Sequence, residues 1–267
     1  MSVADWIEYQ APSGRYTFSK EDVRKEFPDM TPHAIDTAVQ RAVTKGRIFS
    51  PYRGFYVVVP EEYRLWKAVP QEVYLDRMMQ HLGRAYYVAL LSAAERHGAA
   101  HQAPMGFQVM VESPVLRDKE REGYALRYAE RHQIPMEYVE RREVPTGWLN
   151  VSSPELTAVD LIAYQDHVGG LSRSATVLEE LALKLDFARL DAPFLQVAPA
   201  PVFQRLGYLL DRVLEEESVA DDLLGLMKSG GLKMKAVPLR LGVSTDGAQV
   251  DKKWKVMVNQ EIEIDEL

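Results

Sequence analysis

The chain has 267 residues, of which 46% are hydrophobic and 27% charged, and its formal net charge is −7 at pH 7. The length allows one large domain or two of ordinary size, and the composition is that of a globular protein. The absence of cysteine excludes disulfides, thiolate metal sites and cysteine nucleophiles, and it fits the reducing cytoplasm that we expect as the location. Because the whole chain is acidic, any contact with nucleic acid has to be local.

No targeting or membrane segment is expected. The N-terminal stretch MSVADWIEYQ contains no basic region followed by an apolar run. No stretch approaches the roughly eighteen uninterrupted apolar residues that a membrane helix needs.

The first thirty residues predict two helices around a short strand. Trp6 and Ile7 lie on the apolar side of the first helix, and residues 16–18 are prone to form a strand. Ser19 and Asp22 have the spacing of a capping box, which places the start of a second helix there.

Residues 31–59 predict a third helix followed by a β-hairpin. Thr31 can cap the helix, Pro32 suits its first position, and Gly46 can end it. The apolar residues at three- and four-residue steps, which predict one buried stripe, are Ile35, Ala38, Val39 and Ala42. The two strands are expected over 48–50 and 55–59, joined by the turn Pro51-Tyr52-Arg53-Gly54.

Charge suggests a use for this segment. No acid lies between Asp36 and Glu61, whereas cations cluster there in a chain that is acidic overall. A phosphate backbone selects such a cluster on a helix face and a hairpin tip. We therefore predict a winged helix-turn-helix domain over residues 1–62, with the third helix in the major groove and the hairpin as the wing. The alternative is a small α/β domain whose charged face is only solvated.

The candidate DNA-binding residues lie on the third helix and the hairpin. They are His33, Thr37, Gln40, Arg41, Thr44, Lys45, Arg47, Tyr52 and Arg53. Glutamine suits adenine and arginine suits guanine in the major groove, and the other cations suit phosphates. Each of them could instead be a solvated surface residue.

Residues 63–267 predict a larger mixed α/β domain, so the fold class expected for the chain is α+β. Helices are expected over 73–82, 85–104, 153–167, 172–185 and 203–210. Strands are expected around 107–111, 124–128 and 148–151 and from 254 to the end of the chain. A basic loop with two glycines is expected over 228–235.

For each candidate catalytic or metal-binding residue, the sequence supports a structural role better than a chemical one. His97 and His101 have the spacing of two metal ligands, but no third ligand follows them. An acid-and-lysine set like that of a nuclease could be formed by Asp160, Glu179, Glu180 and Lys184, although all four are expected on helices. Ser152 and Ser153 lack an adjacent histidine base and suit helix capping. We therefore expect no catalytic residue, metal or cofactor.

Two other kinds of protein remain as alternatives. One is a metal-dependent nuclease that the winged helix targets to DNA. The other is a pure protein-interaction module whose acidic end, Glu261–Glu266, docks on a basic partner.

Six segments together resemble a known family. They are GRIFSPYRGFYVVVPEEY at 46–63, LLSAAERHGAAHQ at 90–102, PTGWLNVSSPELTAVDLIAY at 145–164, GGLSRSATVLEELA at 169–182, QRLGYLLD at 204–211 and WKVMVN at 254–259. In this order they resemble the AbiEi family, the antitoxins of abortive-infection type IV toxin–antitoxin systems. The chain departs from the family at Pro60-Glu61, where Pro-Pro is common, and at Arg96, where leucine is common; neither is a candidate DNA contact.

The resemblance implies a non-enzymatic phage-defence protein with two domains. Its winged helix is implied to repress its own operon by binding inverted repeats in the promoter. Its C-terminal domain is implied to support repression and to counter a nucleotidyltransferase-like toxin encoded next door, without requiring a stable complex. The implied base contacts fall on Thr37, Gln40, Arg41 and Thr44, and the phosphate contacts on Lys45, Arg47 and Arg53.

Overall fold

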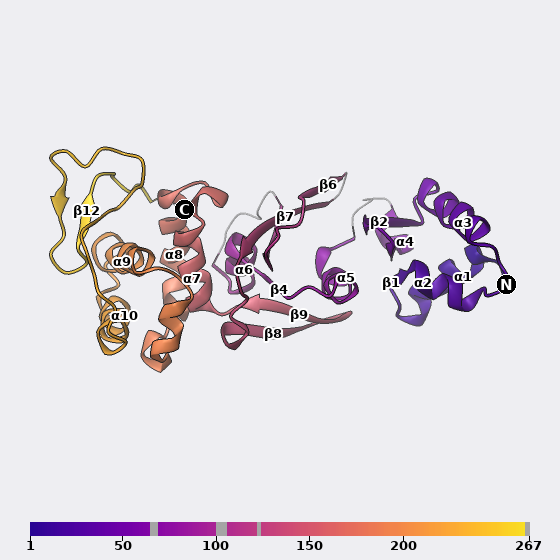
Figure 1. Cartoon of the computed structure of the whole chain (residues 1–267), viewed down its shortest axis with the longest axis horizontal. Helices are drawn as coiled ribbons and strands as arrows, with labels where there is room; N and C mark the ends of the chain where they lie inside the picture. The colour runs from indigo at the N-terminus through magenta and orange to yellow at the C-terminus, as the bar shows by residue number, and fades with distance from the viewer. Residues whose placement is uncertain (65–68, 100–105, 122–123, 265–267) are drawn as a thin grey trace. The chain divides into compact units, whose positions relative to one another are not determined.

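The computed structural model describes residues 1–64, 69–99, 106–121 and 124–264, whose helices and strands are labelled in Figure 1. The chain divides into two compact units. The first comprises Met1–Tyr87, Met105–Ile134 and Arg141–Asn150, and the second Val88–Pro104, Pro135–Glu140 and Val151–Leu267. Because helices accompany several sheets, the α+β class predicted from the sequence is confirmed.

The first unit begins with three helices and a small antiparallel sheet. The helices are α1 (Val3–Gln10), α2 (Lys20–Glu26) and α3 (Pro32–Thr44). The strands are β1 (Thr17–Ser19), β2 (Ile48–Tyr52) and β3 (Phe55–Val58), paired in the order β1-β3-β2. The order of elements along the chain is the one expected from the sequence.

Caps set where these helices begin. At α2, the Asp22 N–H donates to Ser19 Oγ over 3.2 Å, and the Ser19 N–H donates to Asp22 Oδ2 over 2.7 Å, which is the expected capping box. At α3, the Ala34 N–H donates to Thr31 Oγ1 over 3.2 Å. Gly46 has a φ of +66°, the left-handed conformation that leads the chain out of α3. Each cap contributes roughly 1 kcal/mol.

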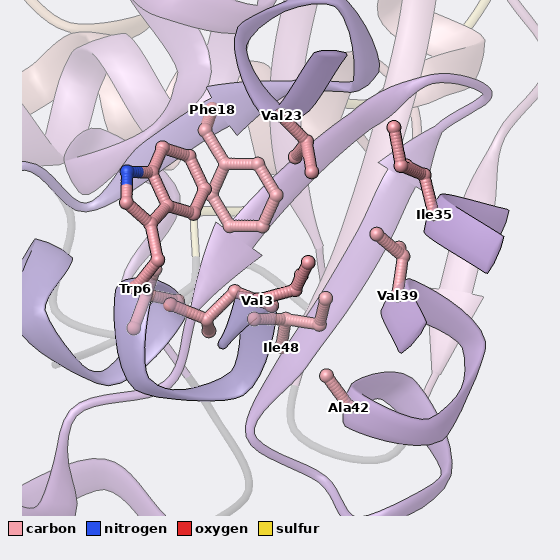
Figure 2. Packing of buried hydrophobic residues seen from close by; sticks show 10 residues of the cluster. Val3, Trp6, Phe18, Val23, Ile35, Val39, Ala42 and Ile48 are labelled. Carbon is pink, nitrogen blue, oxygen red and sulfur yellow. The ribbon is translucent and has the colours of Figure 1, made fainter. Parts of the chain in front are cut away.

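A hydrophobic core fixes which side of α3 faces solvent. Figure 2 shows side chains of all three helices and of β1 and β2 around this core. Its members are Val3, Trp6, Ile7, Phe18, Val23, Ile35, Val39, Ala42, Ile48 and Val58. The Trp6 and Phe18 rings meet edge to face at a centroid distance of 5.2 Å. Since α3 buries Ile35, Val39 and Ala42 here, its opposite face is left outside.

The hairpin turn is shorter than expected. Tyr52 lies opposite Phe55, so the turn consists of Arg53 and Gly54 alone. A register shift before Tyr52 accommodates Pro51, which has no N–H for the strand ladder. Gly54 has a φ of +80°, as a two-residue hairpin turn requires.

The hairpin also packs against the segment that follows it in the first unit. The Phe49 and Tyr74 rings meet edge to face at 5.6 Å, and the Phe55 and His81 rings lie 5.4 Å apart. This segment includes α4 (Glu61–Arg64) and α5 (Leu75–Leu82). The compact unit therefore continues beyond residue 62, while the domain boundary near Tyr63 stays a prediction.

The main sheet has the strand order β6-β7-β5-β4-β9-β8. Its strands are β4 (Tyr86–Val88), β5 (Phe107–Glu112), β6 (Lys119–Arg121), β7 (Tyr124–Arg131), β8 (Val139–Val144) and β9 (Gly147–Ser152). β5 pairs in parallel with β7 and is buried on both faces over most of its length. Burial on both faces is the environment expected for a strand in a parallel pair.

The second unit is mainly helical, with a small sheet of order β10-β12-β11. Its helices are α6 (Leu90–Arg96), α7 (Pro154–Ala163), α8 (Leu171–Leu181), α9 (Ala200–Tyr208) and α10 (Glu217–Ser229). Its strands are β10 (Val237–Pro238), β11 (Gln249–Val250) and β12 (Val256–Val258). α7 is buried on all sides from Pro154 to Ile162, which makes it the central helix of this unit.

Short 3₁₀ turns and one π-helical turn complete the described elements. The 3₁₀ turns are η1 (Ala11–Ser13), η2 (Gln71–Val73), η3 (Met136–Tyr138), η4 (Gln165–His167), η5 (Ala182–Lys184), η6 (Phe187–Arg189) and η7 (Ala192–Gln196). The π-helical turn η8 (Leu209–Val213) continues α9. Within the described ranges, no helix has the length and apolar character needed to cross a membrane.

Two expectations for the C-terminal two thirds were wrong, and one helix was missed. The helix expected over 85–104 starts as strand β4, because Tyr86, Tyr87 and Val88 are buried side chains of the main sheet. The final strand spans only Val256–Val258, and the Glu263 N–H downstream donates to Ser172 Oγ over 3.3 Å instead of joining a ladder. Helix α10 was not expected, although its apolar residues at helical spacing are buried.

Candidate nucleic-acid interface

The solvent-facing side of α3 presents one narrow stripe of polar side chains. With about 100° between successive residues of a helix, the stripe residues project within about 60° of one another. They are His33, Thr37, Gln40 and Thr44. Thr37 is half-buried and the other three are exposed, so the stripe is open to a ligand.

The two threonines of this stripe use their hydroxyl hydrogens inside the helix. Thr37 Oγ1–H donates to the His33 carbonyl over 2.9 Å, and Thr44 Oγ1–H donates to the Gln40 carbonyl over 3.0 Å. With their hydrogens used in this way, the two hydroxyl oxygens can only accept a hydrogen bond from a ligand. The direct donors of the stripe are therefore His33 and Gln40.

Arg41 and Lys45 lie on one flank of the stripe. They project about 70° and 110° from its centre, on the same side. Both are exposed, and neither takes part in an ion pair among the residues that the structure describes. Their full positive charges are available to an anion.

The hairpin tip is connected to the start of α2, next to the other flank. Arg53 is exposed, as is Tyr52 with 37% of its surface accessible. The Lys20 N–H donates to the Gly54 carbonyl over 2.9 Å, and the Lys20 ammonium forms an ion pair with Asp36 of α3. These contacts hold the tip close to α3.

Arg47 has a different environment from the other predicted cations. It is half-buried and forms an ion pair with Glu8 of α1. Its charge is thus balanced before any ligand arrives. The sequence could not reveal this, because Glu8 is distant along the chain and no short-range pattern joins the two residues.

Lys20 and Asp36 were also missed at the sequence level. No sequence pattern singles out Lys20, and Asp36 only marks where the stretch without acids begins. The Tyr56 phenol lies near both: burial raises its pKa, Lys20 works against this rise, and Asp36 adds to it. The two charged side chains belong to the surface where α2, α3 and the hairpin meet.

Outside the N-terminal segment, the described residues that were considered for metal binding or catalysis do not form a site. His97 is buried with Nε2 2.7 Å from the Ser152 carbonyl, and His101 lies outside the described residues. Asp160 is completely buried in α7, whereas Glu179 and Lys184 are exposed.

Ser153 has the capping role that the sequence predicts. The Leu156 N–H donates to Ser153 Oγ over 3.2 Å, so Ser153 caps α7 as expected. Among the described residues, no three His, Asp or Glu side chains are grouped so that they could hold a metal ion.

The acidic end of the chain is described as far as residue 264. Glu261 and Glu263 are exposed, and the remaining acids of the predicted docking segment, Asp265 and Glu266, lie outside the described residues.

Comparison with solved structures shows a similar fold. The crystal structure of the RV2827C protein from Mycobacterium tuberculosis matches with a TM-score of 0.68 and 15% sequence identity, over 94% of this chain and 88% of that chain. At this identity the likeness concerns the fold alone. The search of curated proteins finds no match.

Comparison with protein families identifies the domain that follows α5. Residues 87–212 match the family model of the AbiEi antitoxin C-terminal domain. Four of the six segments that carry the resemblance in the sequence lie inside this range. The match supports an antitoxin role in a toxin–antitoxin system. Residues 87–212 of the chain are therefore similar to the C-terminal domain of AbiEi antitoxins.

Proposed function

We propose that the N-terminal winged helix-turn-helix binds inverted repeats in the promoter of its own operon and represses it. On this proposal α3 enters the major groove, with its stripe facing base edges, and the hairpin contacts the backbone. The observation that carries the proposal is the arrangement of α3: an open polar stripe with Arg41 and Lys45 on one flank and the hairpin tip held near the other.

Within this docking, each predicted residue has a role that follows from its position. Gln40 is the best candidate for a base contact because it is exposed and lies in the stripe. Arg41, Lys45 and Arg53 are exposed cations suited to phosphates or guanine. His33, Thr37, Thr44, Arg47 and Tyr52 complete the proposed contact set.

Charge balance suggests that one copy binds weakly. Residues 1–60 contain eight Lys or Arg and seven Asp or Glu, so binding depends on where the charges lie. Each neutralised phosphate releases counterions, which makes affinity fall steeply with salt. Two copies on neighbouring half-sites raise occupancy through effective concentration, which suits a promoter with inverted repeats.

The antitoxin role requires a toxin as its partner. We propose that the protein counters a nucleotidyltransferase-like toxin from the adjacent gene, in the cytoplasm, without catalysis of its own. The support is the match of residues 87–212 to the AbiEi antitoxin C-terminal domain. No observation favours the nuclease alternative, since Asp160 is buried and the described residues hold no metal-binding group.

A shift assay with the promoter DNA tests the docking. The full-length protein should bind the upstream DNA at physiological salt, and Arg41→Ala and Arg53→Ala should each weaken binding. Arg64→Ala is the matched control, because Arg64 is an exposed arginine that already pairs with Glu61 and lies outside α3 and the hairpin. Unchanged affinity in both α3 and hairpin variants would refute the assigned surface.

Co-expression tests the antitoxin part separately. The wild type should restore growth of cells that express the neighbouring toxin from a promoter that the antitoxin does not control. Arg41→Ala should do so equally well, because we place neutralisation in the C-terminal domain. Failure of the wild type to restore growth would refute the proposed toxin partner while leaving DNA binding intact.

A further inference from the structure

One acid interrupts the solvent-facing side of α3. Asp36 is the sole acidic residue of this helix, and its carboxylate forms an ion pair with the Lys20 ammonium at the start of α2. The Asp36 side chain keeps 49% of its surface accessible and that of Lys20 keeps 30%. An ion pair this exposed stabilises a fold only weakly, so stabilising the fold is not its obvious role.

The position of the pair is more informative than its strength. Asp36 projects about 70° from the centre of the α3 stripe, on the side opposite to Arg41. Lys20 is tied to the hairpin turn through its N–H, which donates to the Gly54 carbonyl over 2.9 Å. The pair therefore lies between the stripe and the tip that carries Arg53, on the surface proposed to face DNA.

The charges at this point oppose each other. A phosphate placed against this flank is attracted by Lys20 and repelled by Asp36, so the pair offers it almost no net charge. A lysine whose charge is already balanced contributes little to counterion release until it leaves its partner.

We propose that Asp36 sets the strength of DNA binding by holding the Lys20 ammonium, so that a DNA phosphate has to compete with Asp36 for Lys20. This inference rests on the proposed DNA-binding function. Lys20 is then a phosphate contact held in reserve, and Asp36 acts through it as a positioning residue. The arrangement keeps affinity low enough for salt and operator sequence to decide occupancy.

A double-mutant cycle on the full-length protein tests the inference. Asp36→Asn, Lys20→Met and the combined variant are compared with wild type in binding to the promoter DNA between about 50 and 200 mM salt. Asp36→Asn should bind about three- to ten-fold tighter, with a salt slope steeper by about one phosphate contact. Lys20→Met should bind somewhat more weakly than wild type, because it leaves the Asp36 charge unbalanced, and Asp36→Asn should give a smaller gain in affinity in the Lys20→Met background than in wild type.

Other variants separate charge from shape. Asp36→Glu keeps the charge and should retain wild-type affinity. Circular dichroism and thermal melting of each variant check that the fold is intact, which is expected because both side chains are partly exposed.

Each remaining outcome overturns the inference in its own way. If Asp36→Asn tightens binding equally in the Lys20→Met background, Asp36 repels phosphate directly and Lys20 is not involved. If Asp36→Asn leaves affinity and salt slope unchanged, the pair lies outside the DNA contact. If the wild type does not bind the promoter at all, the proposed function fails and this inference fails with it.

Discussion

The indole N–H of Trp254 donates a hydrogen bond of 2.7 Å to the Asp211 carboxylate, deep inside the second unit. The Lys253 ammonium lies 2.9 Å from the same oxygen, Oδ2. This contact joins the turn after α9 to the segment that leads into β12. Asp211 and Trp254 therefore have a structural role in the second unit.

Replacing Asp211 by asparagine should lower stability near neutral pH. Burial by itself raises the pKa of Asp211, but hydrogen bonds from Trp254 and Lys253 and the charges of Lys253 and Arg212 outweigh it and hold the pKa below its ordinary value. A depressed folded pKa gives stability that is present above the unfolded value of about 4 and is lost as pH falls through the folded pKa.

Urea unfolding of wild type and Asp211→Asn between acidic and neutral pH measures this effect. The variant should lose about 1–3 kcal/mol at pH 7, and the difference between the two proteins should shrink in acid. A difference that is the same at both ends of the pH range would show that the carboxylate charge is not responsible.

Gly207→Ala should destabilise the second unit. A Cβ at this position would lie 2.0 Å from the Trp254 ring, which is fully buried and has no room to move. Overpacking of this kind costs about 1–3 kcal/mol. Gly225→Ala is the matched control, since α10 has open space there and alanine favours helix by up to about 1 kcal/mol. Chemical unfolding should therefore shift in opposite directions; equal shifts would contradict the packing described.

Gln40→Ala and Lys45→Ala should affect DNA binding in different ways. The glutamine variant should lose about 1–3 kcal/mol on the operator and little on unrelated DNA, because a base contact carries sequence information. The lysine variant should weaken both and reduce the salt slope by about one. Titrations with operator and scrambled duplexes measure both effects, and a uniform loss in Gln40→Ala would remove it from the base-reading set.

Arg47→Ala should weaken promoter binding less than Arg53→Ala. Arg47 already forms an ion pair with Glu8, whereas Arg53 is exposed without one among the described residues. A phosphate has to compete with Glu8 for the Arg47 guanidinium, so Arg47 attracts it less strongly than Arg53 does. Fluorescence anisotropy at several salt concentrations compares the two variants. Equal losses would mean that DNA displaces Glu8 at no measurable cost.

Local signals were enough to predict the order of the N-terminal helices and strands. Thr31 and the Ser19–Asp22 box identified two helix starts, and the apolar steps from Ile35 to Ala42 identified the buried face of α3. These features depend on neighbours within one turn of helix, which a sequence displays directly. The contacts of Arg47 with Glu8 and of Lys20 with Asp36 depend on tertiary packing, so no local pattern indicated them.

The errors in the C-terminal part have a similar origin. Tyr86–Val88 is followed closely by an alanine-rich helix, and composition over the longer window favoured helix throughout. The strand exists because the main sheet buries those three side chains, which is a long-range effect. The alternation after Trp254 predicted a longer strand than the three residues that find a pairing partner.

The path of the chain limits how this molecule can be divided for study. Each compact unit is assembled from separate stretches, because residues 88–104 and 135–140 interrupt the first unit and belong to the second. No single cut in the polypeptide releases either unit whole. A fragment ending near residue 64 would also leave Phe49 and Phe55 without the rings of Tyr74 and His81. A truncated protein that failed to bind DNA could have failed because it was misfolded. Point variants of the intact chain avoid this ambiguity.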